Sequence, residues 1–413
     1  MFKNISLNLS IINQFVFLLL VLFPIFLISG NLLINIFYTS IAILSFFNIK
    51  KDDSFFKSGI FFLLVFFLVC LTINLIFSIN LINSFPRFIK FLLIILFIKE
   101  IHRFVNINEV YFQKILKFWV YIFFVVTIDI IFEIIFGFNI LGFKSPLQGR
   151  ISSFFGDELV VGSFYHFFSL LVISYFIDKK FQNSIVVILV VTIIVISFMI
   201  GERANFFKLF FSIALILFFI LKINLVKKIG IIFLISSLIS AITFFDNDLK
   251  NRYYGQISKI YSIDGFKEYF QGSLYGAHQN AAYRIFENNI FFGVGLKNFR
   301  DESKKEIYKN IEYKRTHERQ ATHPHQIHLE LLAETGLIGY FSFLVLILSS
   351  LYISFRNYLL SRNVYQLSTI IFVVSCLIPL IPSGSLFSTF FGGIFWFNFG
   401  LMVSFNKNLN FKF

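Results

Sequence analysis

The residues best suited to chemistry gather in one short stretch of this chain, "THPHQIHLELLAETGLIGY" (residues 322–340). It holds three of the seven histidines and two glutamates, and the apolar run "FSFLVLILSSLYISF" follows directly. An imidazole has an unperturbed pKa of about 6.5, so it can accept or donate a proton near neutral pH. The candidates for a general base or hydrogen-bond donor, and for the groups that orient it, are His323, His325, Gln326, His328 and Glu334.

Two other interpretations of this stretch stay open. A zinc site would use His323, His325 and His328 with a carboxylate, although the spacing differs from the His-x-x-x-His of a helical metal site. A polar cluster at a membrane interface, without chemistry, is the other alternative. We favour a metal-free site without a cofactor, in which His325 does the chemistry and His323 and His328 surround it.

Three arginines add permanent positive charge. Arg203 lies in "MIGERANFF", Arg284 in "AAYRIFENNIFFGVGLKNF" and Arg150 in "SPLQGRISSFFGDELVVGSF". A guanidinium binds phosphate through two parallel hydrogen bonds and stays charged at any working pH. The three residues are therefore candidates for binding an anionic substrate.

Each arginine also has a plainer interpretation. Arg203 could extend from an apolar segment to the membrane interface, and Arg284 could form a surface ion pair with Glu287. Arg150 could pair with carboxylates at 157 and 158.

The composition shows where these residues must be positioned. Hydrophobic residues make up 57% of 413 and charged residues 14%, against about 25% in a soluble domain. The mean hydropathy is +0.81, and apolar runs reach the length that crosses a bilayer. The two cysteines each lie in an apolar run, which indicates neither a disulfide framework nor a thiolate zinc site. The sequence predicts an all-α polytopic membrane protein.

The apolar runs predict about twelve transmembrane helices. The segments between them that share one side of the membrane hold 17 Lys and Arg, whereas the short segments on the other side hold about four. This asymmetry places the basic side, both termini included, in the cytoplasm, with the N-terminal run kept as the first span. The expected spans are 11–29, 31–47, 59–79, 84–100, 117–137, 159–177, 184–200, 204–221, 227–245, 332–355, 365–381 and 385–405.

One outer segment, residues 246–331, is large and polar. It holds 13 Lys and Arg, 11 Asp and Glu, and five of the seven histidines. It divides the chain into spans one to nine (1–245), a partly helical periplasmic loop (246–331) and spans ten to twelve (332–413). The net charge of +14 is mainly a topology signal, and no basic patch suited to nucleic acid is evident.

The local signals predict how the candidate residues are held. Thr322 or His323 caps a helix whose first turn takes Pro324, so that His325 and His328 lie one turn apart. Gly336 and Gly339 would let neighbouring helices approach closely.

Four motifs together resemble the O-antigen ligase and polymerase superfamily. "HPHQIHLELLAETGLIG" resembles its His-containing signature, and "RIFENNIFFGVGLKNF" its Arg segment before a G-x-G-x-x-F turn. "GERAN" resembles the family's Ser-Arg turn, and "GRISSFFGDELVVGSF" its upstream outer loop. Their order and predicted side match the family. Glu202 and Gln326 depart from the usual Ser and Asn, and His328 stands where Tyr is frequent.

The resemblance implies a metal-independent glycosyltransferase of the membrane-embedded GT-C type, in the bacterial inner membrane. Such an enzyme takes a glycan from an undecaprenyl-diphosphate carrier on the periplasmic face. The acceptor is lipid A–core sugar in a ligase and a carrier-linked glycan in a polymerase. The family's essential positions correspond to Arg203, Arg284 and His325 in this sequence.

Two rivals stay open at this point. A polymerase would use the same donor and the same arginine and histidine positions as a ligase. A lipid-linked sugar transporter would show charged or broken helices at the midplane. Asp129 and Glu133, one turn apart in the fifth span, are the notable charges there; they could pair with an arginine or line a cavity.

Overall fold

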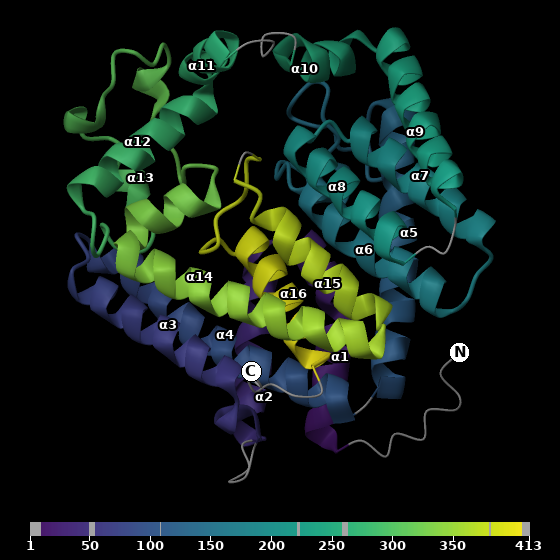
Figure 1. Ribbon diagram of the computed structural model, residues 1–413, viewed down its shortest axis with the longest axis horizontal. Helices are drawn as coiled ribbons and strands as arrows, with labels where there is room; N and C mark the ends of the chain where they lie inside the picture. Colours follow the sequence, from purple (N-terminus) through teal and green to yellow (C-terminus); the bar gives the residue numbers. More distant parts are fainter. Residues whose placement is uncertain are drawn as a thin grey trace.

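The computed structural model describes residues 10–48, 54–107, 109–220, 224–257, 263–379 and 381–406. All regular structure within these ranges is helical, which agrees with the predicted fold class. The two ends of the chain, expected in the cytoplasm, lie outside the described residues. The chain is a multi-pass membrane protein that carries its polar helices at one end of an apolar bundle (Figure 1).

Twelve helices of the described chain coincide with the predicted spans. They are α1 (Ile11–Ile28), α2 (Asn31–Phe47), α3 (Gly59–Ile76), α4 (Leu81–Ile107), α5 (Glu109–Phe136), α6 (Val161–Asp178), α7 (Asn183–Met199), α8 (Arg203–Phe219), α9 (Leu225–Phe245), α14 (Ile327–Ser361), α15 (Val364–Cys376) and α16 (Phe390–Ser404). Seven of these, within the described residues, are long and apolar enough to cross a membrane: α1, α3, α4, α5, α6, α9 and α14. The count of twelve spans stays a prediction.

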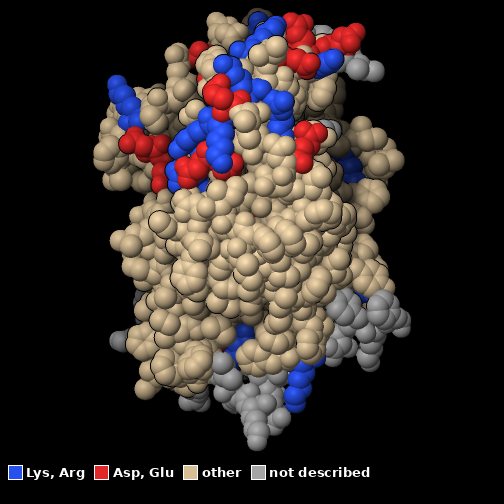
Figure 2. Space-filling view, turned by 90° about the vertical axis from the view of Figure 1, so that its left-hand side faces the viewer, with Lys and Arg blue, Asp and Glu red and all other residues tan. Residues whose placement is uncertain are grey.

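The surface carries the pattern of a membrane protein. Figure 2 shows a broad band without charged side chains between a densely charged end and an opposite end where Lys and Arg reappear. The charged end contains the helices of the large outer segment, as the sequence predicts. Many large apolar side chains are exposed across the bundle, such as Phe62, Ile188 and Phe233. In lipid such exposure carries no hydrophobic cost.

Aromatic side chains fill the centre of the bundle. Every residue of α16 is buried. Phe397 of this helix stacks on Phe23 of α1, with ring centroids 4.0 Å apart, and Trp119 of α5 packs on the same ring. The abundant phenylalanine therefore serves packing here.

The large outer segment is folded, as the sequence predicts. It forms α10 (Asn247–Ile257), α11 (Ile263–Gly272), α12 (Leu274–Asn288) and the short α13 (Phe299–Glu302). The amphipathic sequence "AAYRIFENNI" lies in α12, and its apolar face packs on α14 through Ala281, Ile285 and Ala333. Two short 3₁₀ turns, η3 (Glu306–Tyr308) and η4 (Thr316–Glu318), also belong to this segment. Elsewhere in the described chain there are two more, η1 (Ser54–Lys57) and η2 (Ser153–Phe155).

The predicted N-terminal cap of the helix that contains the tenth span is wrong. Neither Thr322 nor His323 caps it, and Pro324 lies outside the helix. Instead α14 begins at Ile327, and the Gln326 side chain accepts a hydrogen bond from the Leu329 N–H at 2.7 Å. Glutamine is an uncommon cap, so the residue preferences pointed elsewhere. His325 consequently precedes the helix, with a left-handed φ of 56°.

The predicted role of Gly336 is also wrong, because this residue interrupts α14. Its φ of 64° and ψ of −169° break the helix, and the 290–295 segment enters the gap. The two segments exchange four backbone hydrogen bonds, from Val294 to Ala333, Gly295 to Glu334, Leu337 to Ile290 and Ile338 to Phe291. We call this arrangement the clasp.

The clasp leaves no room for side chains at two glycines. A Cβ on Gly336 would lie 2.3 Å from the Phe291 carbonyl oxygen, and one on Gly293 would lie 2.6 Å from the Gly336 nitrogen. Gly293 also has a positive φ, 65°. Asn74 of α3 completes the clasp by donating to the carbonyls of Phe292 and Glu334 at 2.6 and 2.8 Å. The glycine-containing segments "FFGVGLKNF" and "ETGLIG" thus pack against each other in the clasp.

The carboxylates of α5 bind the loop that follows this helix. Glu133 accepts from the N–H groups of Ser152 and Ser153 at 3.2 and 2.6 Å, and Asp129 accepts from the Ser153 hydroxyl at 2.6 Å. Both carboxylates are buried. They therefore fix the 139–153 loop, which contains Arg150. Among the described residues, neither carboxylate pairs with an arginine.

Candidate functional site

A cavity of about 830 Å³ lies where the outer ends of the transmembrane helices meet the polar helices. Helices α10 and α11 arch above it (Figure 1). Its walls come from α2, α4, α6, α8, α10, α11, α12, α13 and α16, from the turn between α7 and α8, from the loop after α12, and from the loops before α6, α14 and α16. The cavity is therefore assembled from segments spread across most of the chain.

The cavity wall is strongly basic. Among the described residues that line it, Glu202 is the one carboxylate, against seven cationic side chains. These are Arg87, Arg150, Arg203, Lys208, Arg252, Lys297 and Arg300. Such an excess of positive charge in a concave, partly apolar site attracts anions.

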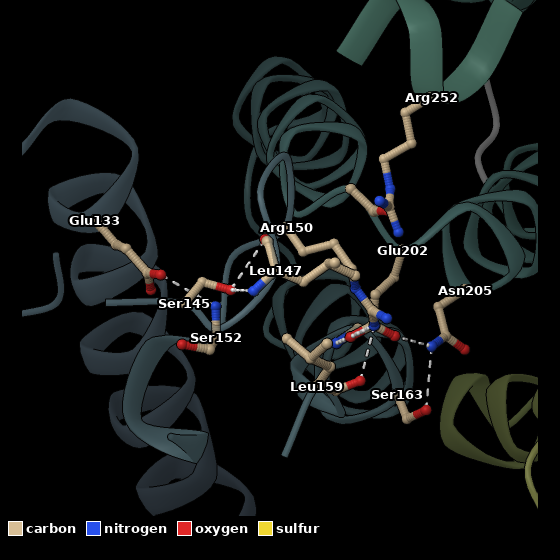
Figure 3. Close-up of polar contacts among 12 residues, drawn as sticks. Glu133, Ser145, Leu147, Arg150, Ser152, Leu159, Ser163, Glu202, Asn205 and Arg252 are labelled. Atoms are coloured by element: carbon tan, nitrogen blue, oxygen red, sulfur yellow. Dashed lines mark hydrogen bonds and ion pairs between the residues drawn. The ribbon is translucent and has the colours of Figure 1, made fainter. Parts of the chain in front are cut away.

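One wall is organised around Glu202, which ends the turn between α7 and α8 (Figure 3). Its carboxylate forms an ion pair with Arg150 at 2.9 Å and accepts from the Gly162 N–H at 3.1 Å. Asn205 donates to the other oxygen at 2.6 Å. Arg150 also donates to the Leu159 carbonyl at 2.8 Å. The partner of Arg150 is thus Glu202, whereas the sequence suggested the carboxylates at 157 and 158.

Helix α10 adds a third arginine to this wall. Arg252 extends from α10 toward the turn that carries Glu202 (Figure 3), and its Nε donates to the Gly201 carbonyl at 2.7 Å. Arg203 donates in return to the Arg252 carbonyl at 3.0 Å. Burial and the positive charges of Arg150 and Arg203 lower the pKa of the Arg252 guanidinium. This wall therefore holds three guanidinium groups and one carboxylate, which pairs with Arg150, and net positive charge faces the cavity.

The histidines form the opposite part of the cavity lining. The rings of His323 and His325 have centroids 4.1 Å apart, and Tyr275 of α12 lies 4.9 Å from His325. His278 stacks on the far face of His325 at 5.4 Å. The Ser383 N–H donates to the His325 carbonyl at 2.9 Å, which joins the loop before α16 to this cluster.

Burial keeps these imidazoles neutral. Burial and, to a smaller extent, the charges of His278 and Lys297 lower the pKa of His325 to about 4. Burial, with His325 and Lys297, lowers the pKa of His323 to about 2. Burial also lowers the pKa of His278. A neutral imidazole has a free nitrogen lone pair, so His325 can accept a proton at neutral pH.

A comparison with protein families finds a match within this chain. Residues 186–344 match the family described as O-antigen ligase. This segment is an O-antigen ligase family domain. The predicted resemblance to the superfamily is thereby confirmed, and the matched segment contains Arg203, Arg252, Arg284 and His325. No curated protein matches the chain.

The O-antigen ligase domain supplies only part of the cavity. The domain contributes α8, α10, α11, α12 and the two histidines. Arg87 of α4, Arg150 and the 381–391 segment lie outside the matched residues, yet they line the same cavity. The parts of the chain beyond the family match therefore belong to the site.

Three candidates of the O-antigen ligase domain hold the backbone and lie outside the cavity lining. Gln326 caps α14 and also donates to the Pro379 carbonyl at 3.0 Å. His328 contacts the Leu377 carbonyl at 2.9 Å and the Tyr340 hydroxyl at 3.2 Å. Glu334 is fully buried and accepts from the Lys297 N–H at 2.8 Å. These residues position the loops that carry the histidines and Lys297.

Arg284 also lies away from the cavity. It is nine residues beyond Tyr275 on α12, which turns it by about 180° to the opposite side of the helix. Its guanidinium donates to the Lys309 carbonyl. The structure therefore brings Arg150, Arg203, His323 and His325 together but separates Arg284 from them.

Several lining residues escaped sequence analysis. Arg87, Arg252, Lys297 and Arg300 are basic residues without a distinctive local motif, and only tertiary contacts bring them together. The sequence feature that came closest to indicating Lys297 and Arg300 was "GVGLKNFR", where these two cations follow a glycine turn. As for metals, the described residues contain no group of three or more His, Cys, Asp or Glu arranged to hold an ion. Metal independence stays a prediction.

Proposed function

We propose that the protein is an O-antigen ligase-like glycosyltransferase of the bacterial inner membrane. It would move a glycan from an undecaprenyl-diphosphate carrier to a sugar hydroxyl of lipid A–core at the periplasmic face. The observation that carries this proposal is a single cavity at the membrane's edge that combines an arginine-rich wall with buried, neutral histidines. The O-antigen ligase domain supports the same reaction class.

The arginine wall would bind the diphosphate of the donor. As the glycosyl bond breaks, the bonding electrons move to the bridging oxygen and the diphosphate gains negative charge. Arg203, Arg150 and Arg252 are already held in place by backbone carbonyls and Glu202. Fixed positive groups stabilise developing charge without reorganising, which is the largest contribution that many enzymes make.

His325 would act on the acceptor. Its neutral ring would accept the proton of the acceptor hydroxyl, while the hydroxyl oxygen forms a bond to the anomeric carbon and the carbon–oxygen bond to the diphosphate breaks. A direct displacement of this kind inverts the anomeric centre. His323 and Tyr275 would hold the ring of His325 in position.

The proposal is tested by transfer assays on the purified protein in lipid nanodiscs. We expect Arg203→Ala and His325→Ala each to lower the transfer rate by about 10²-fold or more, while the melting temperature stays within a few degrees. The control is Lys314→Ala, which removes an exposed cation of the outer helices that pairs with Glu268. Transfer by Arg203→Ala and His325→Ala at the rate of the control would disprove the proposed site.

The acceptor is tested in the source bacterium. Deletion of a ligase leaves long glycans on the carrier and none on lipid A–core, whereas deletion of a polymerase leaves single repeat units on a normal anchor. Unchanged glycans together with carrier-linked sugar trapped on the inner side would instead identify a transporter. The same nanodisc assay in the presence of a chelator tests metal independence, and we expect full activity.

A further inference from the structure

A second cluster of cations lines the cavity on the wall formed by α4 and the 296–301 segment. Arg87 and Arg300 both line the cavity. Within the described part of the chain, neither guanidinium has a hydrogen-bond or ion-pair partner. Their charges act on one another, and Lys90 interacts in the same way with Arg87 and with Lys297.

The contacts around this cluster hold the two arginines near each other. Asn83 of α4 donates to the side chains of Asn298 and Asp301 at 3.1 and 2.8 Å. Ser84 donates to the Leu296 carbonyl at 2.9 Å. These bonds attach the 296–301 segment to α4 one turn before Arg87. Two like charges are therefore kept near each other, which costs energy because they repel.

The available carboxylates near this wall are already engaged. Glu334 acts on Arg87 electrostatically, but its oxygens accept the backbone N–H groups of Lys297 and Phe299. Lys297 donates to the Ser385 hydroxyl at 2.7 Å and lies 3.8 Å from Glu330, so its own charge is partly balanced. Asp301 acts on Arg300 electrostatically, but it already forms an ion pair with Lys304 at 2.9 Å and accepts a hydrogen bond from Asn83. The positive charge without an ion-pair partner on this wall, among the described residues, is thus that of the two arginines.

This cluster is separate from the arginine wall around Glu202. Arg252 interacts with Arg150 and Arg203, whereas Arg87 interacts with Arg300. The histidines are connected to the side of the second cluster through the loop before α16. The Ser383 N–H of this loop donates to the His325 carbonyl at 2.9 Å, and Lys297 donates to the Ser385 hydroxyl of the same loop at 2.7 Å. One cavity therefore has two basic walls, and the proposed base is close to the second.

We propose that Arg87 and Arg300 form a second anion site, which binds a phosphate group of the acceptor and brings its hydroxyl to His325. This inference rests on the proposed function and deepens it, because it assigns the acceptor to the phosphorylated glycolipids. A guanidinium pair suits phosphate, whose oxygens accept several parallel hydrogen bonds. The phosphate can belong to a lipid-anchored core sugar or to the diphosphate of a carrier-linked acceptor.

Direct binding to the protein in nanodiscs tests the site without relying on transfer. The probes are phosphorylated lipid A–core, the same glycolipid after phosphatase treatment, and undecaprenyl diphosphate. We expect Arg87→Ala and Arg300→Ala each to weaken binding of the phosphorylated glycolipid by about tenfold, the usual effect of losing one charged hydrogen bond. Arg203→Ala and the control Lys314→Ala should leave this binding within about twofold.

The phosphatase-treated glycolipid should bind equally to the native protein and to the variant that lacks both arginines. If the acceptor is carrier-linked, undecaprenyl diphosphate will instead occupy two sites in the native protein and one in that variant. If the native protein and the variant that lacks Arg87 and Arg300 bind each of the three probes equally, the inference is overturned. Phosphate-dependent binding in a protein that transfers no glycan would retain this site and refute the proposed function.

Discussion

At the scale of single residues, His325 illustrates how the surroundings set the chemistry. The sequence placed this residue at a membrane interface, where an ordinary imidazole would be about half protonated near pH 6.5. In the fold it is enclosed by Tyr275, His278 and His323, and burial lowers its pKa to about 4. The proposed base is therefore ready to accept a proton without first losing one.

This shift predicts the pH dependence of transfer. A neutral His325 can accept a proton and a protonated one cannot, so activity is lost as the pH falls through the pKa. We expect kcat/KM, which reports the free enzyme, to fall on the acid side near pH 4 and to change little between about pH 5.5 and 8. The measurement is a pH profile of kcat/KM in nanodiscs. The contradicting result would be a loss of activity already near pH 6.5 that is absent only in His325→Ala. It would show that His325 titrates like an exposed imidazole.

Arg284 gives a second prediction at this scale. Since its guanidinium contacts the Lys309 carbonyl outside the cavity, we expect Arg284→Ala to lower transfer several-fold, less than Arg203→Ala, and to lower the melting temperature. Arg284→Lys keeps a donor for the carbonyl and should recover most of both. If Arg284→Ala abolishes transfer at an unchanged melting temperature, Arg284 reaches the substrate directly, as the family resemblance implies.

At the scale of elements, the clasp determines where the site residues lie. It fixes the 290–295 segment against the break in α14, so that Lys297 and Arg300 on one side and the histidines on the other face one cavity. The backbone hydrogen bonds of the broken helix are satisfied by this segment, which avoids the cost of unpaired polar groups at membrane depth.

The clasp predicts a strong penalty for side chains at its glycines. Gly336→Ala and Gly293→Ala combine a left-handed φ with a backbone clash, and we expect each to destabilise the protein by more than about 2 kcal/mol. Gly230→Ala is the matched control, because it lies in α9 with nothing within 4 Å of a new Cβ. Thermal unfolding in detergent measures the difference. Equal melting temperatures for Gly336→Ala and the control would show that the break in α14 is not required.

Sequence reasoning succeeded for elements that depend on local composition. Apolar runs located the apolar helices, with ends that differ by at most eight residues, and the amphipathic pattern located α12. It failed where distant segments decide the outcome. Gly336 resembled a helix-packing glycine because its partner segment lies about 45 positions earlier, and Gln326 was missed because it caps a helix against common preference. For the same reason Arg87 and Arg252 carried no recognisable signal before the fold brought them together.

At the scale of the whole molecule, the arrangement predicts which loops face each side of the membrane. A cysteine at Lys314, in the outer helices, should react with an impermeant thiol reagent added from the periplasmic side. A cysteine at Gln182, between α6 and α7, should react only after the membrane is opened. Native Cys70 and Cys376 are buried, so we expect little background labelling from them. The opposite labelling pattern would invert the proposed orientation and place the cavity in the cytoplasm.

The charge imbalance of the cavity has a consequence for the stability of the whole protein. Seven cations face one carboxylate among the described lining residues, so their mutual repulsion opposes folding as long as the cavity is empty. An anion that enters relieves this repulsion and binds only the folded state. At a fixed ligand concentration, the melting temperature therefore rises with the logarithm of the ligand's affinity. A heat-denaturation screen over phosphorylated glycolipids would thus rank natural ligands without any assay of the reaction. The ligand-free protein, which should have the lowest melting temperature, is the reference.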